Sequence, residues 1–202
     1  MLNVGLTGGI ASGKSMVVQL FAEKGAQIID FDHLTRYVQE PGQPGWQELV
    51  NYFGYAIIND DETINRRKLG EIVFQDPLQL AELNAILHPL IFQEWKHRLA
   101  MLRENSAGKV VISDIPLLIE TDAKKDFDLI ILVYAPPQQQ LERLKIRNGY
   151  TDGEARQRLA SQLPIDLKVP YADIIIDNSF SLEKVSQRVN AVWEELKKKA
   201  DK

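Results

Sequence analysis

Short runs of apolar residues recur along the chain, with helical spacing in the intervals between them. The runs carry too few polar residues for strands with one exposed face, which favours strands covered on both sides. In the intervals apolar residues are spaced as on one face of a helix, as at Val185, Val189 and Val192. Strand and helix therefore alternate, which predicts an α/β fold with a mostly parallel sheet. The predicted strands span residues 3–6, 27–30, 109–113, 129–134 and 174–176.

Two intervals interrupt this alternation. Residues 34–107 show helical patterns without a convincing strand, which indicates a helical insertion between the second and third strands. Residues 145–171 form a smaller excursion, in which Asn148-Gly149 is expected to end one helix and Asp152 to cap the next. The remaining core is expected to comprise residues 1–33, 108–144 and 172–202.

The larger insertion is expected to consist of successive helices separated by turn residues. His88-Pro89 is placed between the last two of them, because proline is common in the first turn of a helix. His88 is then most simply a capping residue at that junction. The predicted helices span residues 46–53, 68–74, 77–87 and 90–102.

The composition is that of an ordinary globular chain. Its 202 residues include 24 Lys+Arg and 28 Asp+Glu, which gives a formal net charge of −4, and 45% are hydrophobic. These values exclude disorder and coiled coil, and the acidic balance argues against a general nucleic-acid binder. No apolar run reaches the roughly 18 to 20 residues that cross a bilayer, and the N-terminus does not resemble a signal peptide. We therefore expect a cytoplasmic protein with no nucleic-acid or membrane partner, while the pattern indicates no particular oligomeric state.

The absence of cysteine narrows the chemistry further. Without Cys the chain has no disulfide, no thiolate nucleophile and no Cys-based metal site. The three histidines, His33, His88 and His97, lack the spacing of a metal site.

The most specific motif follows the first predicted strand. Residues 8–15, Gly-Gly-Ile-Ala-Ser-Gly-Lys-Ser, match the phosphate-binding pattern G-x-x-x-x-G-K-[ST] at every fixed position. In such a loop the backbone N–H groups surround the phosphates, Lys14 reaches the β and γ oxygens, and the Ser15 hydroxyl supplies a magnesium ligand. A chance glycine-rich turn is the alternative, but the apolar strand before the loop and the helix after it favour a nucleotide site.

Two carboxylates follow the second predicted strand. Alternation would place Asp30 and Asp32 on the same side of the chain, at the edge where α/β sheets bind ligands. A carboxylate there can accept the proton of an attacking hydroxyl, as a kinase requires. The alternative is a helix cap, which stays open for Asp30, whereas the catalytic interpretation is favoured for Asp32.

Another acidic residue closes the third predicted strand. Asp114 resembles the acidic position that holds magnesium through water in phosphate-loop enzymes, although it could also cap the turn at Pro116. Farther on, Arg143 and Arg147 share a helix face and could stabilise a transferring phosphoryl group from a mobile lid. Solvated pairing with Glu142 or Glu154 is the alternative for these arginines.

Over almost its whole length the chain resembles the dephospho-CoA kinases, which phosphorylate the ribose 3′-hydroxyl of dephospho-CoA with ATP. The order and spacing of several motifs carry this resemblance more than any motif alone. They are the phosphate loop, Asp30-Phe31-Asp32 with Arg36, Glu40-Pro41-Gly42, Asn65 to Leu69, His88-Pro89-Leu90-Ile91, Asp114 to Glu120, Arg143 with Arg147, Gln162, Ala172-Asp173 and Ile176-Asp177-Asn178.

The resemblance implies a three-layer phosphate-loop core that binds ATP, an acceptor domain at 34–107 and an arginine-bearing lid at 145–171. It implies ATP as phosphoryl donor, Mg²⁺, and dephospho-CoA as acceptor. The implied catalytic residues are Asp32 as base, Lys14, Arg143 and Arg147, and the nucleotide-binding residues are Gly8, Gly9, Ile10, Ala11, Ser12, Gly13, Lys14, Ser15 and Met16. The implied acceptor-binding residues are Asp30, Asp32, Arg36, His88, Asp114 and Leu117, with Ser15 and Asp114 at the metal.

Three positions depart from the usual family pattern. Ala11 stands where Gly is usual and could restrict a backbone angle, and Met16 replaces a small residue. Phe31 stands where Ala is usual, and its ring would either narrow the acceptor site or face away from it.

Two other functions compete with this hypothesis. Another small-molecule kinase with a phosphate loop could act on a nucleoside or a sugar acid. A nucleotide switch is the second alternative, but the chain lacks the glycine expected three residues after Asp114 and any Asn-Lys-x-Asp segment that would read guanine.

Overall fold

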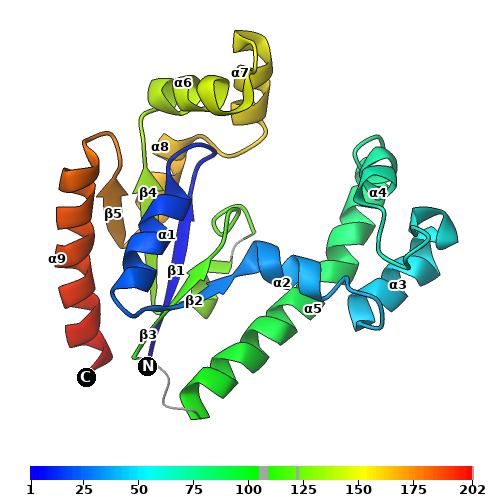
Figure 1. Ribbon diagram of the computed structural model, residues 1–202, viewed down its shortest axis with the longest axis horizontal. Helices are drawn as coiled ribbons and strands as arrows, with labels where there is room; N and C mark the ends of the chain where they lie inside the picture. The colour runs from blue at the N-terminus through cyan, green and yellow to red at the C-terminus, as the bar shows by residue number, and fades with distance from the viewer. Residues whose placement is uncertain (105–108, 122, 202) are drawn as a thin grey trace. The chain divides into compact units, whose positions relative to one another are not determined.

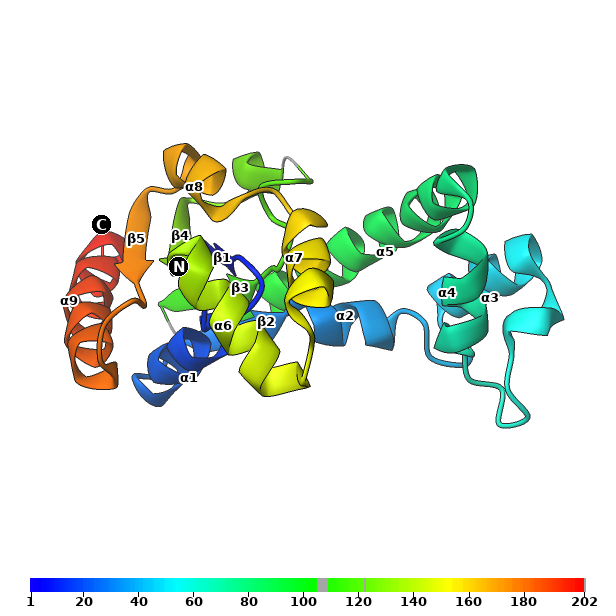
Figure 2. The ribbon, with the colours of Figure 1, turned by 90° about the horizontal axis from the view of Figure 1, so that it is seen from above.

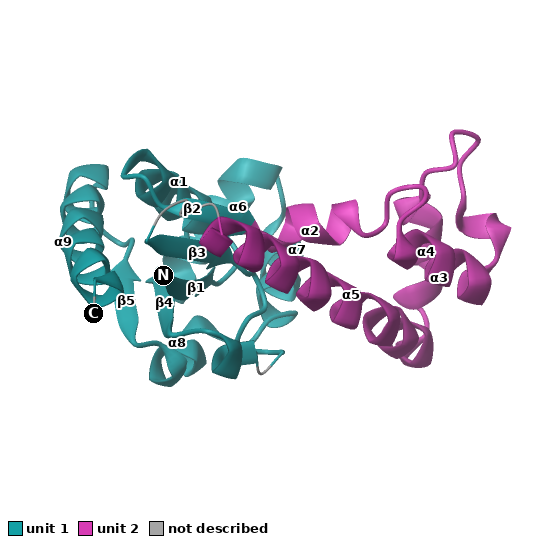
Figure 3. Ribbon diagram, turned by 90° about the horizontal axis from the view of Figure 1, so that it is seen from below, with its two compact units in different colours: residues 1–29, 105–202 teal, residues 30–104 magenta. Residues whose placement is uncertain are grey.

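The computed structural model describes residues 1–104, 109–121 and 123–201. The chain forms two compact units, which Figure 3 shows in separate colours. Unit 1 consists of Met1–Ile29 together with Asn105–Lys202, and unit 2 consists of Asp30–Glu104.

Unit 1 is built on a five-stranded parallel sheet with the strand order β2-β3-β1-β4-β5 (Figure 1). Every strand lies at one of the apolar runs, within a few residues of its predicted ends. The α/β prediction with a mostly parallel sheet is therefore confirmed. The strands are β1 Leu2–Gly8, β2 Gln27–Asp30, β3 Val110–Asp114, β4 Leu129–Tyr134 and β5 Ile174–Asp177.

The register of the central strands determines which residues lie together at the carboxyl edge of the sheet. Leu6 of β1 lies opposite Asp114, the last residue of β3, and Gly8 lies opposite Val133 of β4. Parallel strands end at a common edge, so the phosphate loop after Gly8 and the Asp114 carboxylate emerge at the same side of the sheet.

One face of the sheet is covered by α1 (Lys14–Glu23) and α9 (Leu182–Ala200). Val4 and Leu6 point to this face and are completely buried with Phe21 of α1. Gly5 points to the other face, where a Cβ atom would come within 2.5 Å of Leu118 Cδ1. The alternation along β1 thus directs residues to both layers, which explains why Asn3 to Gly8 are all buried.

The small excursion contains α6 (Pro137–Asn148), α7 (Asp152–Ala160), α8 (Ile165–Lys168) and a 3₁₀ turn at Val169–Tyr171. Helices α6 and α7 pack against each other (Figure 2). As predicted, α6 ends at a left-handed residue, Gly149, with φ of 69°.

The cap of α7 differs from the prediction. Thr151, not Asp152, is the N-cap: its side chain accepts from the Glu154 N–H, and the Glu154 carboxylate accepts in return from the Thr151 N–H. This reciprocal pair satisfies two helix-end donors, which a lone aspartate one residue later cannot do. Asp152 instead begins the helix, where hydrogen bonds from Arg156 and Lys145 lower the pKa of its carboxyl.

Unit 2 is helical, as predicted for this part of the chain. Its elements are α2 (Phe31–Tyr37), α3 (Pro44–Phe53), a 3₁₀ turn at Tyr55–Ile57, α4 (Arg66–Val73) and α5 (Pro77–Glu104). None of the helices among the described residues is both long enough and apolar enough to cross a membrane.

The two helices predicted on either side of His88-Pro89 are in fact one. Helix α5 continues through Pro89, and His88 is an exposed helical residue instead of a cap. Proline removes one helical hydrogen bond, but Leu87 and Ile91, the buried residues on either side of it, lie on one face and hold both halves to the same core. Burial of the continuous apolar face of α5 therefore outweighs the tendency of Pro89 to interrupt the helix.

Phe31, one of the departures from the family pattern, belongs to the interior of unit 2. It is only 6% exposed, and its ring centroid lies 5.6 Å from that of Phe92 and 6.0 Å from that of Trp95. The ring therefore joins α2 to α5 in an aromatic cluster and is turned away from solvent.

Candidate active site

The phosphate-loop motif has the strand-loop-helix structure that its sequence predicts. β1 ends at Gly8, the loop follows, and α1 begins at Lys14. A Cβ atom on Gly8 would lie 2.5 Å from Ser12 Oγ and 2.9 Å from the Val133 carbonyl oxygen. The loop thus folds back closely over the end of its own strand, which requires glycine at this position.

The loop contains a left-handed residue that is not glycine. Ala11 has φ of 57°, a conformation that side chains disfavour, so the concern raised by its sequence is justified. The Ala11 and Ile10 side chains pack against a buried cluster of Leu141, Leu144 and Ala155. This packing between the loop and helices α6 and α7 offsets part of the conformational cost.

The Ser12 carbonyl is held by two residues from distant parts of the chain. Asn178 Nδ2 donates to the Ser12 oxygen at 2.7 Å, and Arg143 Nη1 lies 3.5 Å from the same oxygen. Arg143 Nη2 donates to the Asn178 carbonyl at 2.8 Å, so the three groups form one network. Asn178 is 6% exposed and follows β5 directly.

Gly13 is constrained by the same network. Its φ is 89°, and a Cβ atom there would lie 1.9 Å from Asn178 Nδ2. The second fixed glycine of the motif therefore serves both a left-handed backbone and the close approach of Asn178.

Lys14 and Asp114 form an ion pair through Lys14 Nζ and Asp114 Oδ1. Lys14 begins α1 and Asp114 ends β3, so the phosphate-loop lysine and the acidic strand end meet at the sheet edge. Glu120, the other acidic residue of its motif, lies elsewhere and pairs with Lys168 Nζ at 2.6 Å. Of the two carboxylates, Asp114 is the one beside the phosphate loop.

Ser15 and Asp114 offer the oxygen ligands that Mg²⁺ prefers. Ser15 is exposed in the first turn of α1, and Asp114 stands at the adjoining sheet edge. No group of three or more acidic or histidine residues that could hold a metal occurs within the described ranges. The residues present thus fit an ion whose remaining ligands would be phosphate oxygens and water.

The two arginines predicted to act together have different surroundings. Arg143 reaches the phosphate loop, whereas Arg147 is exposed near the end of α6, where its Nε donates to Asn148 at 2.9 Å. Glu142 and Glu154, the alternative partners predicted for these arginines, form other hydrogen bonds. Glu142 accepts from Gln138, and Glu154 accepts from Thr151.

Three of the candidate acceptor residues, Asp30, Asp32 and Arg36, lie at the start of α2 or along it. Asp30 Oδ1 accepts from the Asp32 N–H at 2.8 Å and the His33 N–H at 3.1 Å, which makes Asp30 the N-cap. Asp32 is already helical, so strand alternation does not set its direction. Its carboxylate is exposed in the first turn, and Arg36 is exposed one turn later.

The other three predicted acceptor residues are separate from this group: Asp114 pairs with Lys14, and His88 and Leu117 are on other segments. His88 lies on α5 of unit 2, and Leu117 lies after β3 of unit 1, where it is 42% exposed.

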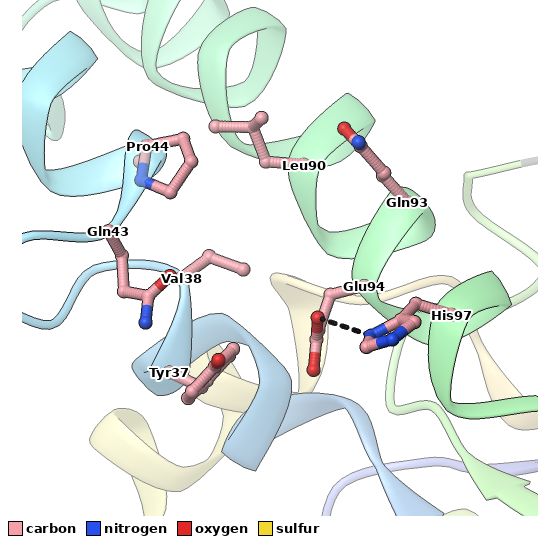
Figure 4. Close-up of a pocket in the computed structure, with 9 residues that line it drawn as sticks. Tyr37, Val38, Gln43, Pro44, Leu90, Gln93, Glu94 and His97 are labelled. Atoms are coloured by element: carbon pink, nitrogen blue, oxygen red, sulfur yellow. Dashed lines mark ion pairs between the residues drawn. The ribbon is translucent and has the colours of Figure 1, made fainter. Parts of the chain in front are cut away.

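A pocket of ≈ 180 Å³ opens between α2, the start of α3 and α5 in unit 2 (Figure 4). Val38, Pro44 and Leu90 give it apolar walls. Its polar groups include Glu94, which accepts from Arg98 Nε at 2.7 Å and lies 3.6 Å from His97 Nδ1. Sequence reasoning missed this pocket, because its residues come from three helices and share no motif.

A second pocket, of ≈ 200 Å³, lies within unit 1 beside the phosphate loop. Gly9 and Ile10 of the loop form one wall, and the segment from Leu159 to Ile165 forms another. The segment that follows α7 therefore borders the phosphate loop directly.

Comparison with known proteins identifies a consistent set of relatives. The family model described as dephospho-CoA kinase matches residues 2–184. A dephospho-CoA kinase of Syntrophus aciditrophicus is 45% identical over 199 residues, covering 98% of this chain and 85% of that protein.

Two solved structures are similar over nearly the whole chain. A crystal structure of a Thermus thermophilus protein has a TM-score of 0.82 at 31% identity and covers 96% of this chain and 97% of that one. Dephospho-CoA kinase from Campylobacter jejuni has a TM-score of 0.74 at 26% identity, with 97% of both chains covered.

The Gly13 constraint can be tested with a matched pair of substitutions. Gly13→Ala and Gly25→Ala both place a methyl group at a positive φ, but only Gly13 faces Asn178, since no atom lies within 4 Å of a Cβ on Gly25. We expect each to lose about 1 to 2 kcal/mol of stability from backbone strain. Gly13→Ala should in addition weaken ATP binding at least about tenfold, as measured by calorimetry, because the Ser12 carbonyl loses its partner. Equal ATP affinity in the two variants would contradict this account.

Proposed function

The chain belongs to the dephospho-CoA kinase family, and from this membership we propose that it transfers the γ-phosphoryl group of ATP to the ribose 3′-hydroxyl of dephospho-CoA. The products are coenzyme A and ADP. The observation that best supports the proposal is the assembly of Lys14, Asp114 and Arg143 around a complete phosphate loop. Direct in-line transfer needs no covalent intermediate on the protein.

The residues of unit 1 would bind and stabilise the triphosphate. The loop amides and Lys14 hold the phosphate oxygens, and Lys14 exchanges its carboxylate partner for phosphate when the nucleotide binds. Arg143, fixed by its hydrogen bond to the Asn178 carbonyl, adds positive charge where the transferring group develops negative charge. A magnesium ion held by Ser15, with Asp114 nearby, would neutralise charge on the phosphates. We further propose that residues 145–171 act as a lid and that Arg147 contributes from it.

Asp32 would hold the acceptor hydroxyl and take its proton. Its carboxylate is exposed at the start of α2, and its own N–H is bound by Asp30. The cap fixes the backbone of this first turn and leaves the Asp32 side chain available to a ligand. Arg36, one turn along the same helix, is available for an anionic group of the acceptor.

The division of labour between the two aspartates gives a direct test. Asp32→Asn should lower turnover by about 10² to 10⁴ with nearly unchanged ATP affinity, since the amide cannot accept the proton. Asp30→Asn is the matched control, because asparagine caps a helix as well as aspartate does. Steady-state assays should show near-normal turnover for the Asp30 variant. Near-normal turnover of the Asp32 variant would remove Asp32 from the role of base.

We propose that the pocket of unit 2 receives the amide-containing arm of the acceptor. That arm alternates apolar carbons with amide groups, and the pocket pairs apolar walls with side-chain amides and the Glu94 carboxylate. Residues 34–107 would then act as the acceptor domain. This assignment uses the side chains that line the pocket and not the exposed His88.

Two substitutions of the same kind on α5 test the pocket. Gln93 lines it, whereas Lys96 is an exposed residue outside the lining, so Gln93→Trp should obstruct the pocket and Lys96→Trp should not. We expect Gln93→Trp to weaken dephospho-CoA binding by roughly tenfold or more and to leave binding of AMP, which lacks the arm, unchanged. If both ligands weaken equally, or if both variants behave alike, the pocket does not hold the arm.

The choice of acceptor is tested by multiple-turnover assays with ATP and a panel of acceptors. Dephospho-CoA should be converted to coenzyme A with a kcat/KM at least about a hundredfold above that for shikimate, gluconate or a free nucleoside, since these lack the arm. A sugar acid or nucleoside used better than dephospho-CoA would favour the rival kinase function. ATP hydrolysis without any phosphorylated acceptor would favour a nucleotide switch.

A further inference from the structure

Gln162 joins the end of the proposed lid to the phosphate loop. Its Oε1 accepts the Ile10 N–H at 3.0 Å, across 152 positions of sequence. Gln162 lies between α7, which ends at Ala160, and α8, which begins at Ile165. A single side chain thus ties the returning segment to the loop that binds phosphate.

The segment that carries Gln162 is itself fastened to the core. The Leu163 N–H lies 3.4 Å from Glu120 Oε1, and the same oxygen pairs with Lys168 Nζ at 2.6 Å. Lys168 is fully buried, so its ammonium group depends strongly on this carboxylate. Glu120 therefore anchors the segment just beyond Gln162 and gives the glutamine a fixed base from which to reach the loop.

The Ile10 amide occupies a sensitive place in the loop. The next residue, Ala11, holds an unfavourable left-handed conformation with φ of 57°. A loop that contains such strain keeps its shape only when its surroundings determine it. Gln162 holds the N–H of Ile10, the residue immediately before the strained Ala11, and the apolar contacts of Ile10 and Ala11 act on the same stretch.

We propose that Gln162 is a positioning residue that holds the phosphate loop in its nucleotide-binding conformation through the Ile10 amide. In this role it acts on the loop backbone and lowers the cost of ordering the loop when ATP binds. The lid segment and the nucleotide site are then coupled through this hydrogen bond in addition to the apolar contacts of Ile10 and Ala11. The inference rests on the ATP site of the proposed function and is independent of the identity of the acceptor.

The test compares Gln162→Met with Gln157→Met, a matched change at an exposed position of α7. Gln162→Met should raise the calorimetric Kd for ATP, measured without acceptor, about three- to tenfold, which corresponds to the net value of one hydrogen bond. Amide hydrogen exchange at Ile10, followed by NMR, should accelerate by a similar factor in the ligand-free protein. The Gln157 variant should match the wild type in both measurements.

Gln162→Asn tests whether the length of the side chain matters as well as its amide group. It keeps the side-chain amide but is one methylene shorter, so it should reproduce the Met variant. Unchanged ATP affinity and Ile10 exchange in Gln162→Met would overturn the proposal, as would wild-type behaviour of Gln162→Asn or equal effects at Gln157. Because neither readout uses an acceptor, a wild-type protein that binds ATP but fails to phosphorylate dephospho-CoA would refute the proposed acceptor without affecting this inference.

Discussion

The backbone of the phosphate loop at Ser12 and Gly13 is the constraint on which the nucleotide site depends. Asn178 fills the space that a side chain at Gly13 would occupy, and its amide holds the Ser12 carbonyl. Arg143 contacts the carbonyl oxygens of both Ser12 and Asn178. The same contacts therefore determine the position of the proposed catalytic arginine and the shape of the loop. β1 supplies the loop, β5 leads to Asn178, and β4 leads to the helix that carries Arg143.

The loop is held from a second direction by the helices that follow β4. Ile10 and Ala11 pack on the α6 and α7 cluster, while Gln162 binds the Ile10 amide. These contacts act on the part of the loop where Ala11 introduces strain, and the Asn178 contacts act on the part that leads into α1. The functional consequence is preorganisation: a loop that is already ordered loses less conformational entropy on binding phosphate than a flexible loop would.

The elements that follow from local rules were predictable from the sequence. Short, mostly apolar runs indicate the strands, and the fixed residues of the phosphate-loop motif indicate the turn from β1 into α1. The predictions of a helix end or helix cap are wrong where two local sequence patterns favour different structures. Pro89 favours a break but lies within a continuing apolar face of α5, and Asp152 is a good cap but follows Thr151, whose partner Glu154 completes a capping box. For Asp30 the sequence leaves a helix cap and a ligand-binding role open, and the structure shows that Asp30 is the N-cap of α2.

The site was predictable only as far as motifs reach. The phosphate-loop motif indicates Lys14, while the strand end indicates Asp114 and the helix face indicates Arg143. The structure places Asp114 and Arg143 in contact with the loop. The positioning contacts of Asn178 and Gln162 were not predictable, because an amide side chain in a loop carries no periodic signal of its distant partner. The same holds for the unit 2 pocket, whose walls come from separate helices.

Crystal structures of the protein with and without an ATP analogue would test the central claim, that the loop is ordered before the nucleotide arrives. The account predicts the same loop backbone in both, with Asn178 Nδ2 within hydrogen-bond distance of the Ser12 oxygen and Ala11 at positive φ. A ligand-free loop of different conformation, with Asn178 separated from Ser12, would contradict it.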